Sequence, residues 1–534
     1  MIINDIHIQA IYEPLHPNAS KDTLVQLMLR QSSLVIRDLN ILVPASQLRL
    51  SDLERKYGPL VNPDKDSRQK FEENLVASYV DAIRDPARHG YLLDHIGRVV
   101  LPSDDVYFLR GEQLIGGSPD IPYILTPELR NIHLASSNGS PAVLGDILLG
   151  IQYPGLMAFA YTMLSSVRSL ILGDDIELQA VMWLVGPHGL GKTTTTERIC
   201  LPYHYADGQP YGLLQAASTP AAVEKAAVSC YDAVLVIDDL AKSASPAVER
   251  ERKTLCAKAV RIGTGMVPIT KCNKNGLDNR FCNAGILMTA EFGLDNASDI
   301  ERLIIVPITE QMALPHTLTP GLIGDAIRHF SLWMTEHHKD FLDRLHERVG
   351  ATRHGYHSVR VETNYACLRE VMREFLRSME HLGVSADTGE QIMVRLEAAI
   401  QESLAAQDAA MAKLEEDKAA GNLAYIILAG LGNDAFRTTK NVDKFSDLKS
   451  KKDAVFVKGD LCMIPESLIH FVCAQPGYHD WTRQKVVNEL KSYGALRIQR
   501  NGNSNSNTIK LKHGAPPTYR IVLDALEEAA EKYE

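Results

Sequence analysis

A glycine-rich loop between an apolar run and a helix-forming run constrains this chain more than any other segment. The loop is Gly186-Pro187-His188-Gly189-Leu190-Gly191-Lys192-Thr193. The apolar residues 181–185 before it predict a buried strand, and residues 194–200 after it predict a helix. Glycines let backbone N–H groups curl around a phosphate, and the helix N-terminus adds the positive end of its dipole. The sequence therefore predicts a phosphate-binding loop at the end of a strand.

Two side chains of this loop have the chemistry that a nucleoside triphosphate requires. We expect Lys192 to neutralise the β- and γ-phosphates and the Thr193 hydroxyl to bind Mg²⁺. Thr194 follows them at the start of the predicted helix. The predicted nucleotide-binding residues are therefore the loop residues 186–193 and Thr194, and the predicted cofactors are ATP and Mg²⁺.

A second apolar run, residues 233–237, ends in Asp238 and Asp239. A buried strand here would bring Asp238 beside the loop, where its carboxylate would hold Mg²⁺. Asp239 occupies the position where many NTPases place a Glu that polarises the attacking water. Because Asp is one methylene shorter than Glu, its reach as a general base is shorter too. We predict Asp238 as a metal ligand and both carboxylates as catalytic groups.

Two further strands are predicted at residues 285–289 and 303–306. A polar residue at the end of the first can orient water against the γ-phosphate, so Thr289 is the expected sensor and Glu291 the alternative. Arg302 directly precedes the second strand. An arginine there can reach the γ-phosphate bound by a neighbouring subunit, although a surface salt bridge is the other reading.

This order of motifs resembles that of AAA+ ATPases. Within that class, Gly186-Pro187 and residues 237–240 (Ile-Asp-Asp-Leu) are similar to the superfamily 3 helicases of viruses and plasmids. Residues 259–265 and 286–291 look like those of MCM-like helicases encoded by mobile genetic elements such as staphylococcal cassette chromosomes. The resemblance implies a homo-oligomeric ring, a hexamer, with single-stranded DNA in its central channel. It departs at Thr289, where superfamily 3 enzymes usually have Asn.

Two other features take their meaning from the resemblance. Residues 360–368 resemble the lid helix of that group, which implies Arg360 as a second sensor in the nucleotide site. Residues 266–281 read as two short strands around Asn275-Gly276, a strong hairpin-turn signal. Helicases of this type carry a hairpin there that grips the DNA backbone, so Lys271 and Lys274 are the implied contacts. A solvated basic turn has the same pattern.

The C-terminal region ends in a helix and a pair of strands. Residues 481–494 predict an amphipathic helix, and residues 497–512 predict two strands joined by a polar tip. Helices followed by such a wing describe a winged helix. The wing has no acidic residue and offers four candidate phosphate contacts, Arg497, Arg500, Lys510 and Lys512. Winged helices also bind proteins, so the sequence is compatible with either DNA or a protein as the partner of this domain.

The predicted fold class is α/β, with an AAA+ P-loop NTPase core. The predicted parts are an N-terminal α+β accessory domain (1–140), the ATPase core (141–312), a helical lid and linker (313–436) and a winged-helix domain (437–534). The continuous apolar strands of the core suit a parallel sheet covered on both faces. In the first part, residues 67–85 predict a helix, and residues 91–101 and 106–115 each predict one strand.

Composition narrows the partners and the compartment. A net charge of −10 argues against a uniformly basic surface, although local basic patches remain possible. The eight cysteines form no CxxC pair, and no run of about 18 apolar residues occurs. These patterns predict a cytoplasmic protein without membrane contact. The predicted function is an ATP-dependent DNA helicase that replicates a mobile genetic element. The alternative is an AAA+ switch or remodelling ATPase, such as a loader or defence-system NTPase, that acts on a protein.

Overall fold

The computed structural model divides the chain into two compact units. The first comprises Met1–Leu240, Lys258–Glu291 and Arg302–Ser403, and the second comprises Ala241–Ala257, Phe292–Glu301 and Leu404–Glu534. The structure describes residues 5–14, 23–31, 37–101, 105–117, 122–241, 246–265, 269–273, 276–294, 296–351, 358–419, 423–433, 435–446, 452–475, 478, 481–501, 504–512 and 515–531. None of the helices in these ranges has an apolar stretch that could span a lipid bilayer.

A five-stranded sheet forms the N-terminal part of the first unit, in the order β3–β2–β1–β4–β8. Its strands are β1 (Asp5–Pro14), β2 (Leu24–Gln31), β3 (Arg37–Pro44), β4 (His89–Leu93) and β8 (Tyr123–Leu125). The strand β1 pairs antiparallel with β2 and parallel with β4. Alternate residues of these strands, such as Ile8 and Leu27, are fully buried. Because alternate side chains point to the same face of a sheet, this face is apolar and is covered by helices.

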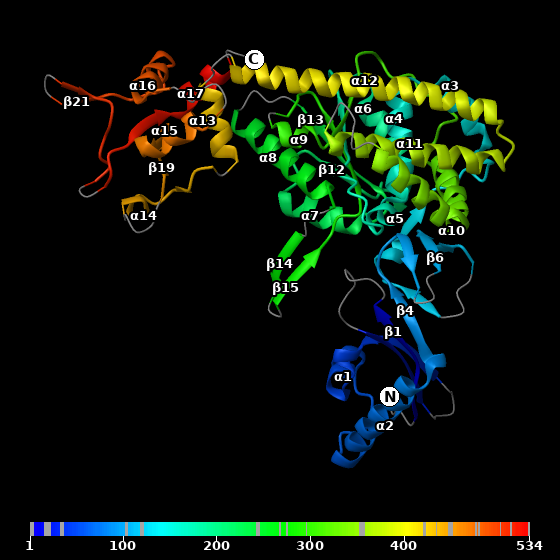
Figure 1. Cartoon of the computed structure of the whole chain (residues 1–534). Helices are drawn as coiled ribbons and strands as arrows, with labels where there is room; N and C mark the ends of the chain where they lie inside the picture. The colour runs from blue at the N-terminus through cyan, green and yellow to red at the C-terminus, as the bar shows by residue number, and fades with distance from the viewer. Residues whose placement is uncertain are drawn as a thin grey trace. The chain divides into compact units, whose positions relative to one another are not determined.

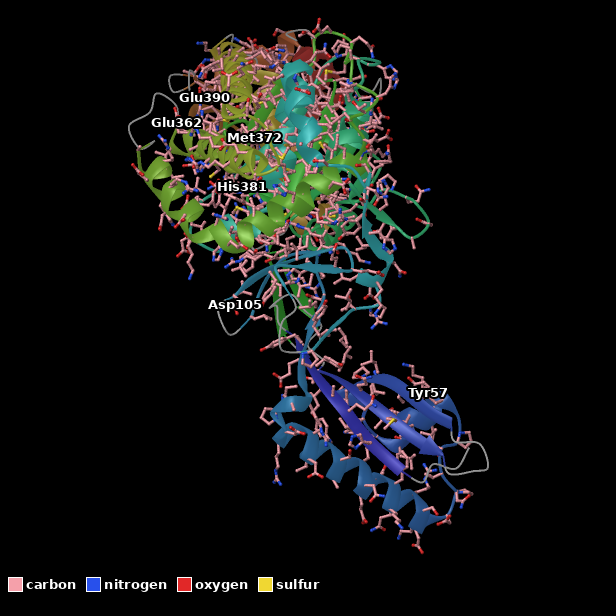
Figure 2. The ribbon with its side chains drawn as sticks, turned by 90° about the vertical axis from the view of Figure 1, so that its right-hand side faces the viewer. Tyr57, Asp105, Glu362, Met372, His381 and Glu390 are labelled. Carbon is pink, nitrogen blue, oxygen red and sulfur yellow. The ribbon has the colours of Figure 1, made fainter. Side chains whose placement is uncertain are left out.

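The helices α1 (Leu50–Tyr57) and α2 (Lys65–Arg84) cover this face. Phe71 and Leu75 of α2 share a core with the strand residues, and Figure 2 shows α2 running along the sheet, with Tyr57 labelled on α1. The Asp64 side chain caps α2 by accepting a hydrogen bond from Ser67 N, and the helix ends before Pro86. The predicted helix at residues 67–85 is therefore confirmed.

A smaller sheet joins β5 (Gly97–Val100), β6 (Val106–Arg110) and β7 (Gln113–Ile115). The prediction of single strands over 91–101 and 106–115 is wrong. The first run breaks before Gly97, whose φ is +101°, and the second breaks at Gly111, whose φ is +66°. Glycine adopts these left-handed values readily, so each apolar run bends into two strands.

A parallel sheet forms the centre of the first unit, in the order β12–β13–β16–β10–β17. Its strands are β10 (Val181–Val185), β12 (Leu213–Gln215), β13 (Val234–Leu240), β16 (Gly285–Ala290) and β17 (Leu303–Pro307). Strand β16 is buried along its whole length, as in sheets that are covered on both faces. The four apolar strands predicted for this region are confirmed.

Helices lie on both faces of this sheet. On one face, a Cβ on Gly285 would lie 1.9 Å from Ser165 Oγ of α4 (Tyr153–Ser166), so glycine permits the close approach of this helix. The next strand residue, Ile286, faces the other side. There, a Cβ on Gly263, the last residue of α8 (Pro246–Gly263), would lie 3.2 Å from Ile286 Cδ1. The predicted two-sided cover is therefore confirmed.

Further short elements surround the central sheet, namely α3 (Leu144–Gly150), α5 (Arg168–Leu172), α7 (Pro220–Ser229), and the paired strands β9 (Ile132–Leu134) and β11 (Tyr203–Tyr205). Three long helices follow β17, namely α10 (Pro320–Ala351), α11 (Val359–Glu380) and α12 (Ala386–Ala419). Figure 2 labels Met372 on α11, which is fully buried. Glu370 and Glu374 of α11 are also buried, and both pair with Arg344 of α10 and Arg377 of α11. These ion pairs neutralise the buried carboxylates and join α10 to α11.

The second unit contains the C-terminal helices α13 (Leu423–Gly432), α14 (Val442–Ser446), α15 (Pro465–Cys473), α16 (Arg483–Ser492) and α17 (Leu523–Glu531). Its main sheet has the order β18 (Thr438–Thr439), β19 (Ala454–Val457), β20 (Asp460–Met463) and β23 (Tyr519–Val522). The strands β21 (Gln499–Asn501) and β22 (Ser504–Ser506) pair antiparallel. The predicted helix within 481–494 and the paired strands within 497–512 are confirmed.

Candidate functional site

The predicted loop leaves the carboxyl end of β10 and enters α6 (Lys192–Thr195), which continues as a π-helical turn (Thr196–Cys200). Gly189 and Gly191 have φ values of +81° and +90°. A Cβ on Gly186 would lie 2.2 Å from Ile308 O, which only glycine at this position avoids. The predicted strand–loop–helix arrangement is therefore confirmed, with a helix that begins at Lys192 and changes to π geometry after Thr195.

Lys192 points back into this loop. Its ammonium donates hydrogen bonds to Gly186 O at 2.5 Å and to Pro187 O at 2.7 Å. Burial lowers the pKa of Lys192, and the carboxylates of Glu291, Asp238 and Asp239 oppose that shift. An ammonium that is bonded to neutral carbonyls can exchange them for phosphate oxygens, which bind it more strongly because they are charged.

The Thr193 hydroxyl donates to the Asp238 carboxylate, at 3.0 Å from Oδ2 and 3.2 Å from Oδ1. Asp238 is 4% exposed, whereas Thr193 is open to solvent. Hydroxyl and carboxylate oxygens are the ligand types that Mg²⁺ takes beside a phosphate. The donor set therefore fits a magnesium ion at the mouth of the loop, where the sequence predicted it.

Thr289 is 1% exposed and lies in contact with both predicted carboxylate residues. Its hydroxyl is 2.5 Å from Asp238 Oδ1 and accepts a hydrogen bond from Asp239 N at 3.0 Å. Asp239 itself is exposed and has a left-handed backbone, with φ of +64°. The structure thus brings together Lys192, Thr193, Asp238, Asp239 and Thr289, which lie in three separate segments of the sequence.

The two predicted arginines, of which Arg302 was expected to serve a neighbouring subunit, lie elsewhere in the unit. Arg302 O accepts from Val181 N, at the end of β10 opposite the loop. Arg360 lies in the first turn of α11, and one turn later Asn364 Oδ1 accepts from Gln179 N, also at that opposite end. The intervening strand spans about 13 Å. Within one subunit, the structure does not bring Arg302 or the start of α11 to Lys192.

A cavity of about 320 Å³ lies beside the loop. It is lined by the start of α4, by residues that follow β17, and by Arg395 and Glu402 of α12. Met312, one of its lining residues, donates from its backbone N to Leu190 O at 3.0 Å, which joins the cavity wall to the loop. Arg395 also donates to the carbonyls of Leu149 and Ile151. Sequence reasoning missed Arg395, because no motif surrounds it.

The predicted hairpin is present as β14 (Ile269–Asn273) and β15 (Gly276–Arg280), and Figure 1 shows it extending away from the central sheet. Asn273 pairs with Gly276, so the connection consists of residues 274 and 275. Lys271 lies on β14, opposite Asp278. Lys274 lies outside the described residues.

Acidic residues from outside the predicted wing neutralise part of its charge. Arg497 Nε donates to Asp460 Oδ2 of β20 at 2.8 Å, and Lys512 pairs with Asp443 of α14. Lys510 is exposed. Arg500 lies on β21, and its side chain lies outside the described residues.

The solvent-facing side of α16 carries cations that the sequence analysis did not single out. Its exposed residues Gln484, Lys485, Asn488 and Lys491 lie on one side of the helix, opposite the buried residues of its core face, and the exposed Arg483 is its first residue. Arg483 lies 3.7 Å from Glu466, a pair with both side chains exposed, and Lys485 lies over the Trp481 ring. We call this surface the α16 face. The signal in the sequence was the amphipathic pattern of the helix.

No protein-family model matches this chain, and no curated protein matches it in sequence. Among solved structures, it is similar to the SCCmec type IV Cch active helicase, with a TM-score of 0.53 and 13% identity, over 99% of this chain and 95% of that one. It also matches JCV helicase bound to a small molecule, at 13% identity over 48% of this chain and 72% of that one, with a TM-score of 0.20. The chain therefore has a helicase-like P-loop fold.

Proposed function

We propose that this chain is an ATP-dependent DNA helicase, a ring-forming translocase with an AAA+ core and a C-terminal winged helix, that serves the replication of a mobile genetic element in the cytoplasm. The observation that carries the proposal is the convergence of Lys192, Thr193 and Asp238 at the end of β10. Folding alone does not require a glycine-rich loop with a lysine and a hydroxyl–carboxylate pair beside it, so a function in nucleotide binding accounts for this combination better. The similarity in fold to the Cch helicase supports the helicase class.

In the proposed site, the backbone of residues 186–193, with Thr194, holds the phosphates, and Lys192 replaces its two carbonyl contacts with phosphate oxygens. Thr193 and Asp238 would hold Mg²⁺, and the ion would supply positive charge beside the phosphates. Asp239, exposed beside them, orients or deprotonates the attacking water. The cavity next to Leu190 is where the base and ribose fit, with Arg395 on its wall.

The ring is proposed because Arg302 lies at the end of the sheet opposite the loop. An arginine at that position cannot serve the nucleotide of its own subunit, but it can face the nucleotide of a neighbour. Arg360 lies in the first turn of α11, near the same end, and we propose that it acts as a second sensor on the nucleotide of a neighbouring subunit. In a hexamer, each nucleotide would then lie between two subunits.

The DNA contacts are proposed on two surfaces. The hairpin β14–β15, with Lys271 and Lys274, would follow the backbone of a single strand in the channel, because a phosphate contact needs cations and no base-specific groups. In the C-terminal part, the proposed contacts are Arg500 and Lys510 of the wing and, in addition, the cations of the α16 face. Arg497 and Lys512 contribute less than their charge suggests, because carboxylates partly neutralise them.

ATPase and forked-duplex unwinding assays test the proposal with the full chain and two variants. Lys192→Ala is expected to abolish both activities, whereas Lys225→Ala, which removes an exposed lysine of α7, is expected to keep them. Hydrolysis by intact oligomers that neither responds to DNA nor unwinds it would refute the helicase. Stimulation by a protein partner instead would favour the remodelling ATPase.

Action between subunits has its own test. Arg302→Ala and Asp238→Ala are each expected to be inactive alone, because each lacks one half of every site. Mixed rings of the two variants would contain some sites with both halves intact, so mixing is expected to restore part of the hydrolysis rate. A mixture that stays as inactive as its components, in rings shown to exchange subunits, would refute a shared site.

A further inference from the structure

We propose that Thr289 is a positioning residue that fixes the carboxylates of Asp238 and Asp239, and that it does not itself contact the nucleotide. The proposal rests on the proposed nucleotide hydrolysis. It departs from the expected role of Thr289, which was to orient water against the γ-phosphate. Three observations carry it: the bonding of the Thr289 hydroxyl, the register of β13 on β16, and the burial of the side chain.

The Thr289 hydroxyl already uses both of its hydrogen-bonding roles. A hydroxyl has one proton, and that of Thr289 goes to Asp238 Oδ1, at 2.5 Å. Its oxygen accepts from Asp239 N at 3.0 Å. Donation to a phosphate or a water would require breaking a charge-assisted bond to a buried carboxylate. Moreover, the side chain is 1% exposed, so a phosphate has no access to it.

The strand β13 carries one extra residue at this point. Ile237 pairs with Met288 and Leu240 with Ala290, so three steps along β13 match two steps along β16. Such a bulge leaves one residue without its ladder partner. Asp239 is in this stretch and has a left-handed φ of +64°, which is disfavoured for residues other than Gly, Asn and Asp. The hydroxyl of Thr289 accepts the N–H of Asp239 and thereby holds the bulge.

The bulge decides where the two carboxylates lie. In a regular strand, consecutive side chains point to opposite faces of the sheet. Here, Asp238 is buried against Thr193 while Asp239 is exposed next to it, at the end of the strand where the loop lies. The Thr289 hydroxyl is hydrogen-bonded to the side chain of Asp238 and to the backbone N–H of Asp239. It therefore links the metal ligand to the proposed base.

Three variants of the full chain test this role. Thr289→Val keeps the shape and the β-branching but removes the hydroxyl, Thr289→Ser keeps the hydroxyl, and Thr289→Cys offers a smaller change with a weak donor. We measure binding of a fluorescent ATP analogue with and without Mg²⁺, together with kcat and KM for ATP. Circular dichroism and thermal unfolding check that each variant folds.

We expect Thr289→Val to need about 10–100-fold more Mg²⁺ for half-maximal binding or turnover, the range seen when groups that orient metal ligands are removed. Its affinity for the analogue without metal should stay within about threefold of wild type, because the loop and Lys192 are unchanged. Thr289→Ser should restore the metal dependence. If Thr289→Val does not fold, Thr289→Cys should show the same shift in smaller measure.

Unchanged Mg²⁺ dependence in the folded Val or Cys variant would overturn the proposal. So would a loss of nucleotide affinity that is the same with and without metal, since that pattern marks a direct contact. The binding measurements need no turnover. A wild type that binds but does not hydrolyse ATP would thus refute the proposed function, while the metal dependence would still decide the role of Thr289.

Discussion

Replacing the buried Arg110 by leucine is expected to weaken the first unit. Arg110 ends β6 and is 2% exposed. Its guanidinium donates to Ser166 O at 2.6 Å, to Ser331 Oγ at 2.8 Å and to Tyr203 Oη at 3.3 Å, and it also reaches Asp232 O at 3.4 Å. One side chain thus joins the small sheet β5–β7 to α4, to α10 and to the turn that precedes β13.

The magnitude follows from what leucine would leave behind. Each buried acceptor that loses its donor costs about 1–3 kcal/mol, whereas removing the charge recovers part of the cost of burying it. The Asp232 carboxyl makes the loss of hydrogen bonds and charge larger than the gain from no longer burying the arginine. Burial raises its pKa, and Arg110 is the main cause that lowers it again. Without Arg110 this fully buried group loses the positive charge that lowers its pKa most, so the net loss of stability is expected to be about 3–5 kcal/mol at neutral pH.

The pH dependence has a definite sign. A carboxyl whose pKa is raised by folding costs stability as the pH rises above its ordinary value of about 4. Because Arg110→Leu raises the folded pKa of Asp232 further, the free-energy gap to wild type is expected to widen from about pH 5 to about pH 8. Adding Asp232→Asn to Arg110→Leu should narrow the gap and remove its pH dependence.

Urea unfolding measures the difference in unfolding free energy between wild type and Arg110→Leu. Trp183 lies buried on β10 in the first unit and Trp481 lies in the second, so a Trp481→Phe background makes the fluorescence report mainly on the first unit. A gap below about 1 kcal/mol at neutral pH, or a gap that is equal at both pH values, would refute the reasoning, because either result means that Asp232 does not depend on Arg110.

Three further predictions concern separate parts of the chain. Gly285→Ala should destabilise the first unit by about 1–3 kcal/mol in thermal or urea unfolding, because its Cβ would lie 1.9 Å from a hydroxyl of α4; an unchanged midpoint would contradict this packing. Asp453→Asn should destabilise the second unit, because hydrogen bonds from Arg437 hold the pKa of Asp453 below its usual value. The difference in unfolding free energy from wild type, measured with urea, should shrink as the pH falls through that lowered pKa. Lys485→Ala with Lys491→Ala should lower duplex-DNA affinity and reduce its salt dependence, measured by fluorescence anisotropy; equal salt slopes would contradict contact at the α16 face.

The sequence predicted the parts of the site that depend on local pattern. The loop residues 186–193 needed only their own glycines and the flanking apolar run, and Asp238 needed only a buried strand before it. Parallel strands bring such carboxyl ends to one edge, so the convergence with Lys192 followed from the strand pattern. Resemblance to known helicases was needed for the hairpin with Lys271, since a short basic turn alone is not specific.

What the sequence did not predict depends on distant contacts. Arg395 bonds to Leu149 O, which lies 246 residues earlier, and no pattern around either residue indicates the contact. The wing looked free of acidic residues, but Asp460, 37 residues before Arg497, supplies a carboxylate. The role of Thr289 depends on the register of two strands, and a bulge of one residue leaves no mark in the sequence.

The left-handed backbone at Asp239 also limits how related chains can diverge at this position. Asp, Asn and Gly tolerate that conformation, whereas Glu would be strained there by about 1 kcal/mol or more. A lineage that exchanges Asp239 for the Glu found in many NTPases is therefore expected to lose the extra residue of β13 at the same time. The need for a hydroxyl at position 289 would disappear with it, so these three features should be inherited or lost together.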